Sequence, residues 1–174
     1  MTPELDAALV RDFPKLYRLR HRKRHRGPRE PIEFGFAVGD GWEPLIRRLA
    51  EKLEPIARKT DLRATQVKEK YGELRFYVEG RVSVEVEAAI DAVEEESCHT
   101  CEECGAPGKM HLRQGWARTR CDSCWAEFLR ACKREKATIA EAPPPPRPAR
   151  AGARGRPAPQ RRRVRVTGSP QEAK

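Results

Sequence analysis

The chain has 174 residues, enough for one folded domain, and 36% of them are charged while 38% are hydrophobic. No apolar run approaches the ~20 residues that a membrane span needs. The first residues, MTPELDAALV, include acids and lack the apolar stretch of a secretory signal. We therefore expect a cytoplasmic protein whose thiols stay reduced.

The net charge of +10 is concentrated at the two ends of the chain. Residues 1–30 carry +5, residues 31–140 carry −2, and residues 141–174 carry +7. An anionic partner would therefore meet the flanks rather than the nearly neutral middle. The last segment consists mainly of Pro, Ala, Gly and Arg, which predicts a disordered tail with polyproline character at residues 143–146.

The first forty residues predict a short helix, a loop and a strand. Apolar residues at helical spacing indicate a helix that ends near Pro14. The basic run RLRHRKRHRGPREP reads as a loop, and residues 32–38 form a short apolar piece that reads as a strand.

An amphipathic helix is predicted next, from an apolar stripe with helical periodicity. The stripe consists of Trp42, Leu45, Ile46, Leu49 and Leu53. Asp40 or Gly41 is the expected N-cap, and Asp40 with Glu43 resembles a capping box. Pro55 should end or kink this helix.

A β-hairpin and two further helices follow. Leu74, Phe76 and Val78 alternate with polar residues, and Gly72 supplies the turn after a first strand over residues 64–71. Residues 83–97 predict a helix that buries an apolar face. The inward residues are Val86, Ala89, Ile90 and Val93, whereas Glu94, Glu95 and Glu96 are expected on a solvated face. A last helix is predicted over residues 125–135, with Trp125, Phe128, Leu129 and Cys132 on one face.

Four of the six cysteines form two C-x-x-C pairs, Cys101 with Cys104 and Cys121 with Cys124, separated by sixteen residues. Each C-x-x-C turn places two sulfurs on one side of a metal, and Zn²⁺ takes four such ligands in a tetrahedron. The spacer allows a short hairpin around Gly115 and matches the usual spacing of two-knuckle zinc sites. The pattern predicts one structural Zn²⁺ held by these four cysteines.

Alternative ligands lie close to the two pairs. Cys98 also forms a C-x-x-C with Cys101, and His99 and His111 are spare candidates, whereas Cys132 is expected in the core. Four thiolates around Zn²⁺ leave a charge of −2, which basic residues of the spacer are expected to offset. These residues are Lys109, Arg113, Arg118 and Arg120.

The predicted fold class is α+β, with a long amphipathic helix, a β-hairpin, a zinc-ribbon-like or knuckle-like module and a basic tail. We divide the chain into an N-terminal helix and basic loop (1–31), an α+β body (32–97), a zinc module (98–136) and a disordered tail (137–174).

Three motifs occur in order between about residues 13 and 125. They are FGFAVGDGWEPLI, QVKEKYGELRFYVEG, and TCEECGAPGKMHLRQGW followed by RCDSC. Together they resemble a family of small uncharacterised proteins of phages and prophage regions. Members of that family often carry a C-x-x-H second pair, where this chain has Cys124, an acceptable exchange for zinc. The resemblance implies a compact unit and a phage-related origin, without an activity.

These patterns favour a binding protein over an enzyme. The glycine-rich GFAVGDGW fits neither the P-loop nor the dinucleotide motif, and we assign no catalytic residue. The sequence RGRP in the tail resembles an AT-hook, which predicts that the basic flanks bind DNA or RNA. The residues predicted to contact nucleic acid are Arg22, Lys23, Arg24, Arg154, Arg156, Arg161, Arg162 and Arg163. The alternative is a protein-interaction module for a host or phage protein, with a structural zinc and a solubilising tail.

Overall fold

A computed structural model of the chain describes residues 1–21 and 29–141, with side chains as far as residue 134. Its helices are α1 (Pro3–Asp12), α2 (Glu43–Ala57), α3 (Val84–Ser97) and α4 (Asp122–Glu141). Two antiparallel hairpins pair β1 (Arg63–Lys70) with β2 (Glu73–Glu79) and β3 (Lys109–Arg113) with β4 (Trp116–Arg120). The predicted α+β class is confirmed. Among the described helices, none has the length and apolar character needed to cross a membrane.

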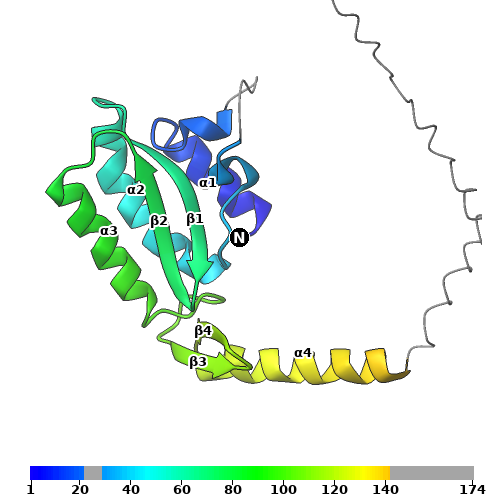
Figure 1. Ribbon diagram of the computed structural model, residues 1–174. Helices are drawn as coiled ribbons and strands as arrows, with labels where there is room; N and C mark the ends of the chain where they lie inside the picture. Colours follow the sequence, from blue (N-terminus) through cyan, green and yellow to red (C-terminus); the bar gives the residue numbers. More distant parts are fainter. Residues whose placement is uncertain (22–28, 142–174) are drawn as a thin grey trace, which may run out of the picture. The chain divides into compact units, whose positions relative to one another are not determined.

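The first hairpin lies at the centre of the fold (Figure 1), with α2 behind it and α3 running alongside β2. Its register places Val67 opposite Phe76, so that the alternating apolar residues face the core, as predicted. The turn has positive φ at both Tyr71 (+57°) and Gly72 (+83°). Two positive φ values give a two-residue loop the twist that a right-handed hairpin requires.

The hydrophobic core is one cluster that joins the N-terminal segment, α2, the first hairpin and α3. The five residues of the predicted α2 stripe expose at most 2% of their surface. Leu9 and Leu16 complete the core from the N-terminal side, and Val86, Ile90 and Val93 of α3 cover another side. The cluster contains no residue after Val93, so β3, β4 and α4 lie outside it.

The predicted strand over residues 32–38 is wrong. Pro31 begins a 3₁₀ helix, η2 (Pro31–Phe34), and Gly35 follows at φ +111°, which breaks an extended chain. Only Ala37 forms an isolated parallel bridge, with Lys68 of β1. Within the basic run, residues 18–21 form a second 3₁₀ helix, η1 (Arg18–His21), instead of a loop.

The capping prediction for α2 is also wrong. A 3₁₀ helix, η3 (Asp40–Trp42), precedes α2, and Trp42 is the N-cap without a side-chain hydrogen bond. The carboxylate of Asp40 instead accepts a hydrogen bond from the backbone N–H of Thr2 (2.6 Å). Pro55 lies inside the last turn of α2 and lacks the N–H that would donate to the preceding turn. The helix ends two residues later, at Ala57.

Candidate metal centre

The two cysteine pairs flank the second hairpin in the sequence, one before β3 and one after β4. Cys101 and Cys104 belong to a turn between α3 and β3, which closes through hydrogen bonds from Cys101 N–H to Ala106 O (2.8 Å) and from Gly105 N–H to Cys101 O (2.9 Å). Gly105 has φ +75°, a left-handed conformation that glycine adopts without steric cost. Cys121 lies between β4 and α4, so pairing of the two strands brings the cysteine pairs together.

The four sulfurs form one compact group, in which all ligand atoms lie within 4.8 Å of one another. A tetrahedron with Zn–S bonds of about 2.3 Å requires sulfurs about 3.8 Å apart. The Sγ atoms of Cys104 and Cys121 are separated by 3.7 Å. The group is therefore compatible with one metal ion such as zinc. Cys101 is buried and Cys104 is exposed, so the group lies at the surface of the fold.

Hydrogen bonds favour a thiolate at Cys121. The Ser123 hydroxyl (3.1 Å) and the Cys124 N–H (3.5 Å) lie against its sulfur and lower the pKa of Cys121 to about 6. Burial and the neighbouring thiols raise the pKa of Cys124. Because α4 begins directly after Cys121, the negative charge lies at a helix N-terminus, which stabilises it.

The alternative ligands have other contacts. Cys98 lies beside α3, with its sulfur 3.7 Å from the backbone oxygen of Glu94. The His111 ring stacks on Trp125 at 4.5 Å, and its Nε2 lies 3.1 Å from Arg120 O. None of Cys98, His99 and His111 belongs to the four-sulfur group found among the described residues. Cys132 is half-buried and is not part of the hydrophobic core, contrary to the prediction.

The basic residues of the spacer are paired with acids and with an aromatic ring. Lys109 forms an ion pair with Asp122 (2.9 Å), and Arg120 forms one with Glu103 (2.8 Å). The guanidinium groups of Arg113, Arg118 and Arg120 lie 5.0–5.8 Å from the ring centroid of Phe128. The carboxylates of Glu103 and Asp122, each next to a cysteine in the sequence, therefore partly neutralise two of these cations.

The glycine-rich loop before α2 docks directly on the first cysteine turn. Gly41 N–H donates to Glu102 O (2.8 Å), and Gly39 N–H donates to the Glu102 carboxylate (3.1 Å). The buried indole of Trp42 donates from Nε1 to Thr100 O (2.8 Å). Three donors of the GDGW motif therefore bind Thr100 and Glu102, the two neighbours of Cys101 in the sequence.

The close approach explains why glycine occupies positions 39 and 41. A Cβ on Gly41 would lie 2.7 Å from Cys104 N and closer still to Cys101 O and Gly105 N, all of them backbone atoms. A Cβ on Gly39 would lie within 3.0 Å of Glu102 backbone carbon. This contact joins segments about sixty residues apart, and no local pattern in the sequence indicates it.

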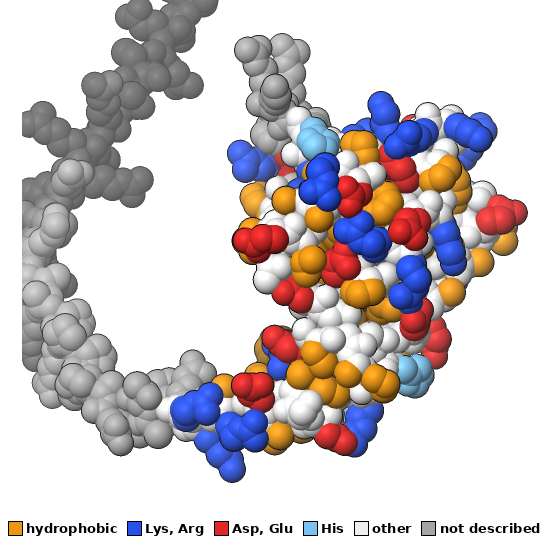
Figure 2. Space-filling model, turned by 180° about the vertical axis from the view of Figure 1, so that it is seen from behind, with side chains coloured by type: hydrophobic (Ala, Val, Ile, Leu, Met, Phe, Trp, Pro, Cys, Tyr) orange, Lys and Arg blue, Asp and Glu red, His pale blue; other side chains and the backbone are white. Residues whose placement is uncertain are grey.

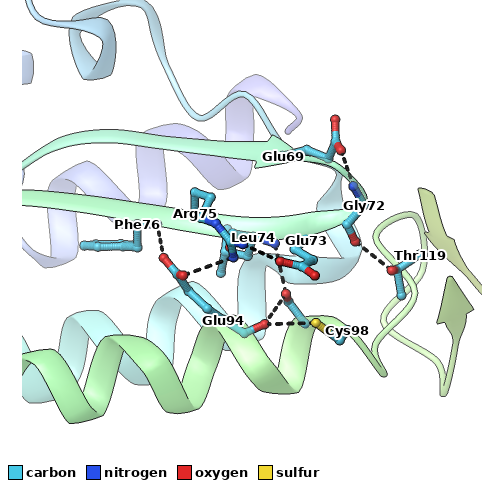
Figure 3. Close-up of polar contacts among 10 residues, drawn as sticks. Glu69, Gly72, Glu73, Leu74, Arg75, Phe76, Glu94, Cys98 and Thr119 are labelled. Carbon is cyan, nitrogen blue, oxygen red and sulfur yellow. Dashed lines mark hydrogen bonds and ion pairs between the residues drawn. The ribbon is translucent and has the colours of Figure 1, made fainter. Parts of the chain in front are cut away.

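The second hairpin also contacts the turn of the first one (Figure 3). The hydroxyl of Thr119 on β4 donates to Gly72 O (2.6 Å), while Gly72 N–H donates to the Glu69 carboxylate (2.6 Å). Thr119 is fully buried, and its carbonyl accepts from Glu102 N–H (2.9 Å). One threonine thus connects β4, the cysteine turn and the β1–β2 turn.

Glu94 has a structural contact instead of the predicted solvated position. Its carboxylate reaches from α3 to β2, where it accepts from Phe76 N–H (2.8 Å) and pairs with Arg75 (3.1 Å), as Figure 3 shows. Ser97, at the end of α3, accepts a further hydrogen bond from Leu74 N–H (2.9 Å). These bonds fix the end of α3 against β2 and so position the cysteine turn that follows.

Comparisons with models of protein families, with curated proteins and with solved structures find no match for this chain. The resemblance to phage proteins stays a prediction. A functional proposal for this chain therefore rests on its sequence and on the geometry of the described residues. The residues predicted to contact nucleic acid (Arg22, Lys23, Arg24, Arg154, Arg156, Arg161, Arg162 and Arg163) lie outside the described residues, as does the polyproline run at 143–146.

Proposed function

We propose that this chain is a non-enzymatic zinc-binding protein that associates with nucleic acid through its basic flanks. One Zn²⁺, held by Cys101, Cys104, Cys121 and Cys124, would fasten the second hairpin and α4 to the folded core. The convergence of four sulfurs within 4.8 Å carries the proposal. Because four cysteines leave no coordination position for water, the zinc has a structural role.

The location of the cysteines outside the hydrophobic core supports this role. The β3–β4 hairpin and α4 contribute no residue to the core cluster, and they follow α3 through a turn of polar residues. A small module without its own core needs another source of stability, which a structural metal can provide. The hydrogen bonds of the GDGW motif then connect the metal site to the start of α2.

The one acidic side chain among the described residues that line a hollow beside α1 has structural partners. This hollow of about 810 Å³ is lined by Asp6, Arg20, His21 and Phe36, among others. The Asp6 carboxylate pairs with Arg20 and accepts a hydrogen bond from Phe36 N–H (3.2 Å). Its carboxylate therefore joins α1 to η1 and to the segment after η2.

The charge distribution supports association with nucleic acid through the flanks. The segments 1–30 and 141–174 carry net charges of +5 and +7, whereas residues 31–140 carry −2. On the face shown in Figure 2, Lys/Arg and Asp/Glu side chains are interspersed over the described residues. Counterion release from nucleic acid favours contacts with concentrated positive charge, which the flanks provide.

Native mass spectrometry of the full chain, with and without a chelator, tests the zinc site. We expect one zinc per chain, lost when both Cys121 and Cys124 are replaced by serine and retained after Cys132→Ser. The Cys132 variant is the matched control, because it removes a thiol of the same helix outside the four-sulfur group. A chain purified without zinc that also fails to take it up would contradict the proposal.

Binding to duplex DNA at several salt concentrations tests the flanks. We expect binding to weaken steeply with salt, and the slope to fall by about one for each phosphate contact that is removed. The test variant replaces five arginines of the tail by glutamine, namely Arg154, Arg156, Arg161, Arg162 and Arg163. Failure of the unmodified chain to bind at low salt would instead favour the protein-interaction alternative.

A further inference from the structure

Two large aromatic side chains are exposed where the two hairpins meet. Trp116, at the start of β4, exposes 76% of its surface, and Tyr71, in the β1–β2 turn, exposes 74%. Burial of rings this large is strongly favourable, so adjacent exposed rings indicate a binding surface. Both residues lie outside the hydrophobic core and outside the four-cysteine group.

Both rings line a single hollow of about 390 Å³ between the hairpins. The residues that line it are Lys68, Glu69, Lys70, Tyr71, Gly115, Trp116 and Ala117. The walls are held together by the hydrogen bond from Thr119 to Gly72 O and by the close packing of Gly72 on the backbone of β4 (Figure 3). These contacts hold together the two backbone segments that carry Tyr71 and Trp116.

Two lysines line the hollow, one of them against the Tyr71 ring and the other against the ring of Tyr77, which lies outside the lining. Lys70 Nζ lies 5.5 Å from the centroid of the Tyr71 ring, and Lys68 Nζ lies 5.7 Å from the ring of Tyr77, which is 40% exposed. Among the described residues, neither lysine forms an ion pair with a carboxylate. The one acid of the lining, Glu69, uses its carboxylate to accept the Gly72 N–H.

We propose that this hollow binds single-stranded nucleic acid. We name it the hairpin groove, and its binding residues are Lys68, Lys70, Tyr71 and Trp116. Unpaired bases would stack on the two rings, and the two lysines would contact the phosphates. A duplex keeps its bases stacked internally and cannot offer them to the rings. The inference rests on the proposed association with nucleic acid and adds a binding site on the folded unit.

The composition of the groove favours nucleic acid over a protein partner. Protein interfaces are enriched in Tyr and Trp but depleted in Lys, and two of the seven residues that line the hollow, Lys68 and Lys70, are lysines. Rings interleaved with unpaired lysines are the pattern expected of a stacking platform along a phosphate backbone. Exposed Leu112, on β3, lies outside the lining and provides a comparison.

Fluorescence anisotropy of the full-length, zinc-loaded chain tests the proposal with labelled oligothymidylate, oligouridylate and a duplex of equal length. We expect Trp116→Ala and Tyr71→Ala each to weaken single-strand binding roughly fivefold to a hundredfold, with duplex binding unchanged. Leu112→Ala is the matched control, because Leu112 is 74% exposed on the same hairpin. A loss of affinity for either oligonucleotide in these two variants, with Leu112→Ala unchanged, supports the groove.

A charge-matched pair of variants separates the lysines of the groove from overall charge. We expect the double change Lys68→Gln with Lys70→Gln to weaken single-strand binding more than Lys52→Gln with Lys59→Gln, which removes two exposed lysines at and just after α2. Equal losses in the two variants would overturn the role of the groove lysines.

Tryptophan fluorescence gives a second measurement that does not depend on an alanine variant folding. Trp42 is fully buried and Trp125 is stacked on His111, so quenching by oligothymidylate should come from Trp116. Trp116→Phe should retain affinity, because stacking tolerates the exchange, and should lose the quenching. Quenching that persists in Trp116→Phe, or unchanged affinity after both Trp116→Ala and Tyr71→Ala, would overturn the proposal.

The glutamine variant of the five tail arginines distinguishes this proposal from that of the flanks. Loss of duplex binding with retained quenching at Trp116 supports the groove and the flanks as separate sites. Unchanged duplex binding in that variant, together with single-strand binding lost in Trp116→Ala, would refute the proposed role of the tail and leave the groove supported.

Discussion

Replacing Gly41 by alanine tests whether the GDGW loop and the metal centre form one unit. The added Cβ would lie 2.7 Å from Cys104 N and closer still to Cys101 O and Gly105 N, whereas ordinary contact begins at 3.4 Å, so the backbone of the cysteine turn must move by more than about 0.7 Å. The neighbouring atoms belong to the backbone of the cysteine turn and cannot rotate away. Overpacking of this kind costs about 1–3 kcal/mol. The displaced turn also carries Cys101 and Cys104, so zinc affinity should fall together with stability.

Urea unfolding and competition with a chelator measure the two effects on the zinc-loaded chain. We expect Gly41→Ala to lower the free energy of unfolding by about 1–3 kcal/mol and to release zinc more readily. Gly115→Ala is the control, because its Cβ meets nothing within 4 Å while its φ of +82° is unfavourable for alanine. That variant should lose about 1–2 kcal/mol of stability and keep its zinc affinity. Unchanged zinc release in Gly41→Ala would refute the coupling.

Three further predictions concern the same region. Trp42→Phe removes the donor to Thr100 O and leaves a polar group unpaired, so urea unfolding should show a loss of about 1–3 kcal/mol; an unchanged midpoint would count against this hydrogen bond. Cys98→Ser should retain one zinc by native mass spectrometry, whereas Cys104→Ser should lose it; the reverse result would indicate a ligand set shifted toward Cys98. The pKa of Cys121 is lowered to about 6 in the folded chain, whereas an ordinary cysteine has a pKa of about 8.5. Between about pH 6 and about pH 8.5 the metal-free folded state therefore binds fewer protons at Cys121 than the unfolded chain does. Its stability should therefore rise with pH across that window, and zinc retention should fall as pH drops below about 6, when protons compete with the metal; pH-independent retention would contradict this.

The sequence predicts those features whose cause is local. Two C-x-x-C pairs and the sixteen-residue spacer are enough to predict that the sulfurs converge, because each turn and the hairpin between them are set by neighbouring residues. The first hairpin is equally local, since alternation fixes its faces and Gly72 permits its turn. The stripe on α2 reflects helical periodicity alone.

The remainder depends on contacts between distant segments. Gly41 looks like a candidate N-cap in the sequence, whereas the structure requires glycine there because the backbone of Cys101 and Cys104 lies too close for a Cβ. Asp40 looks like a cap, yet it binds the backbone at the start of α1. The segment 32–38 is too short for periodicity to separate a strand from a 3₁₀ helix, and Pro31 decides in favour of the helix.

X-ray absorption at the zinc edge, on the full-length chain purified without added chelator, tests the central claim most directly. The proposal predicts one zinc surrounded by four sulfur atoms at about 2.3 Å. A zinc shell that contains nitrogen or oxygen, or a chain that holds no zinc, would contradict the assignment of Cys101, Cys104, Cys121 and Cys124 as its ligands.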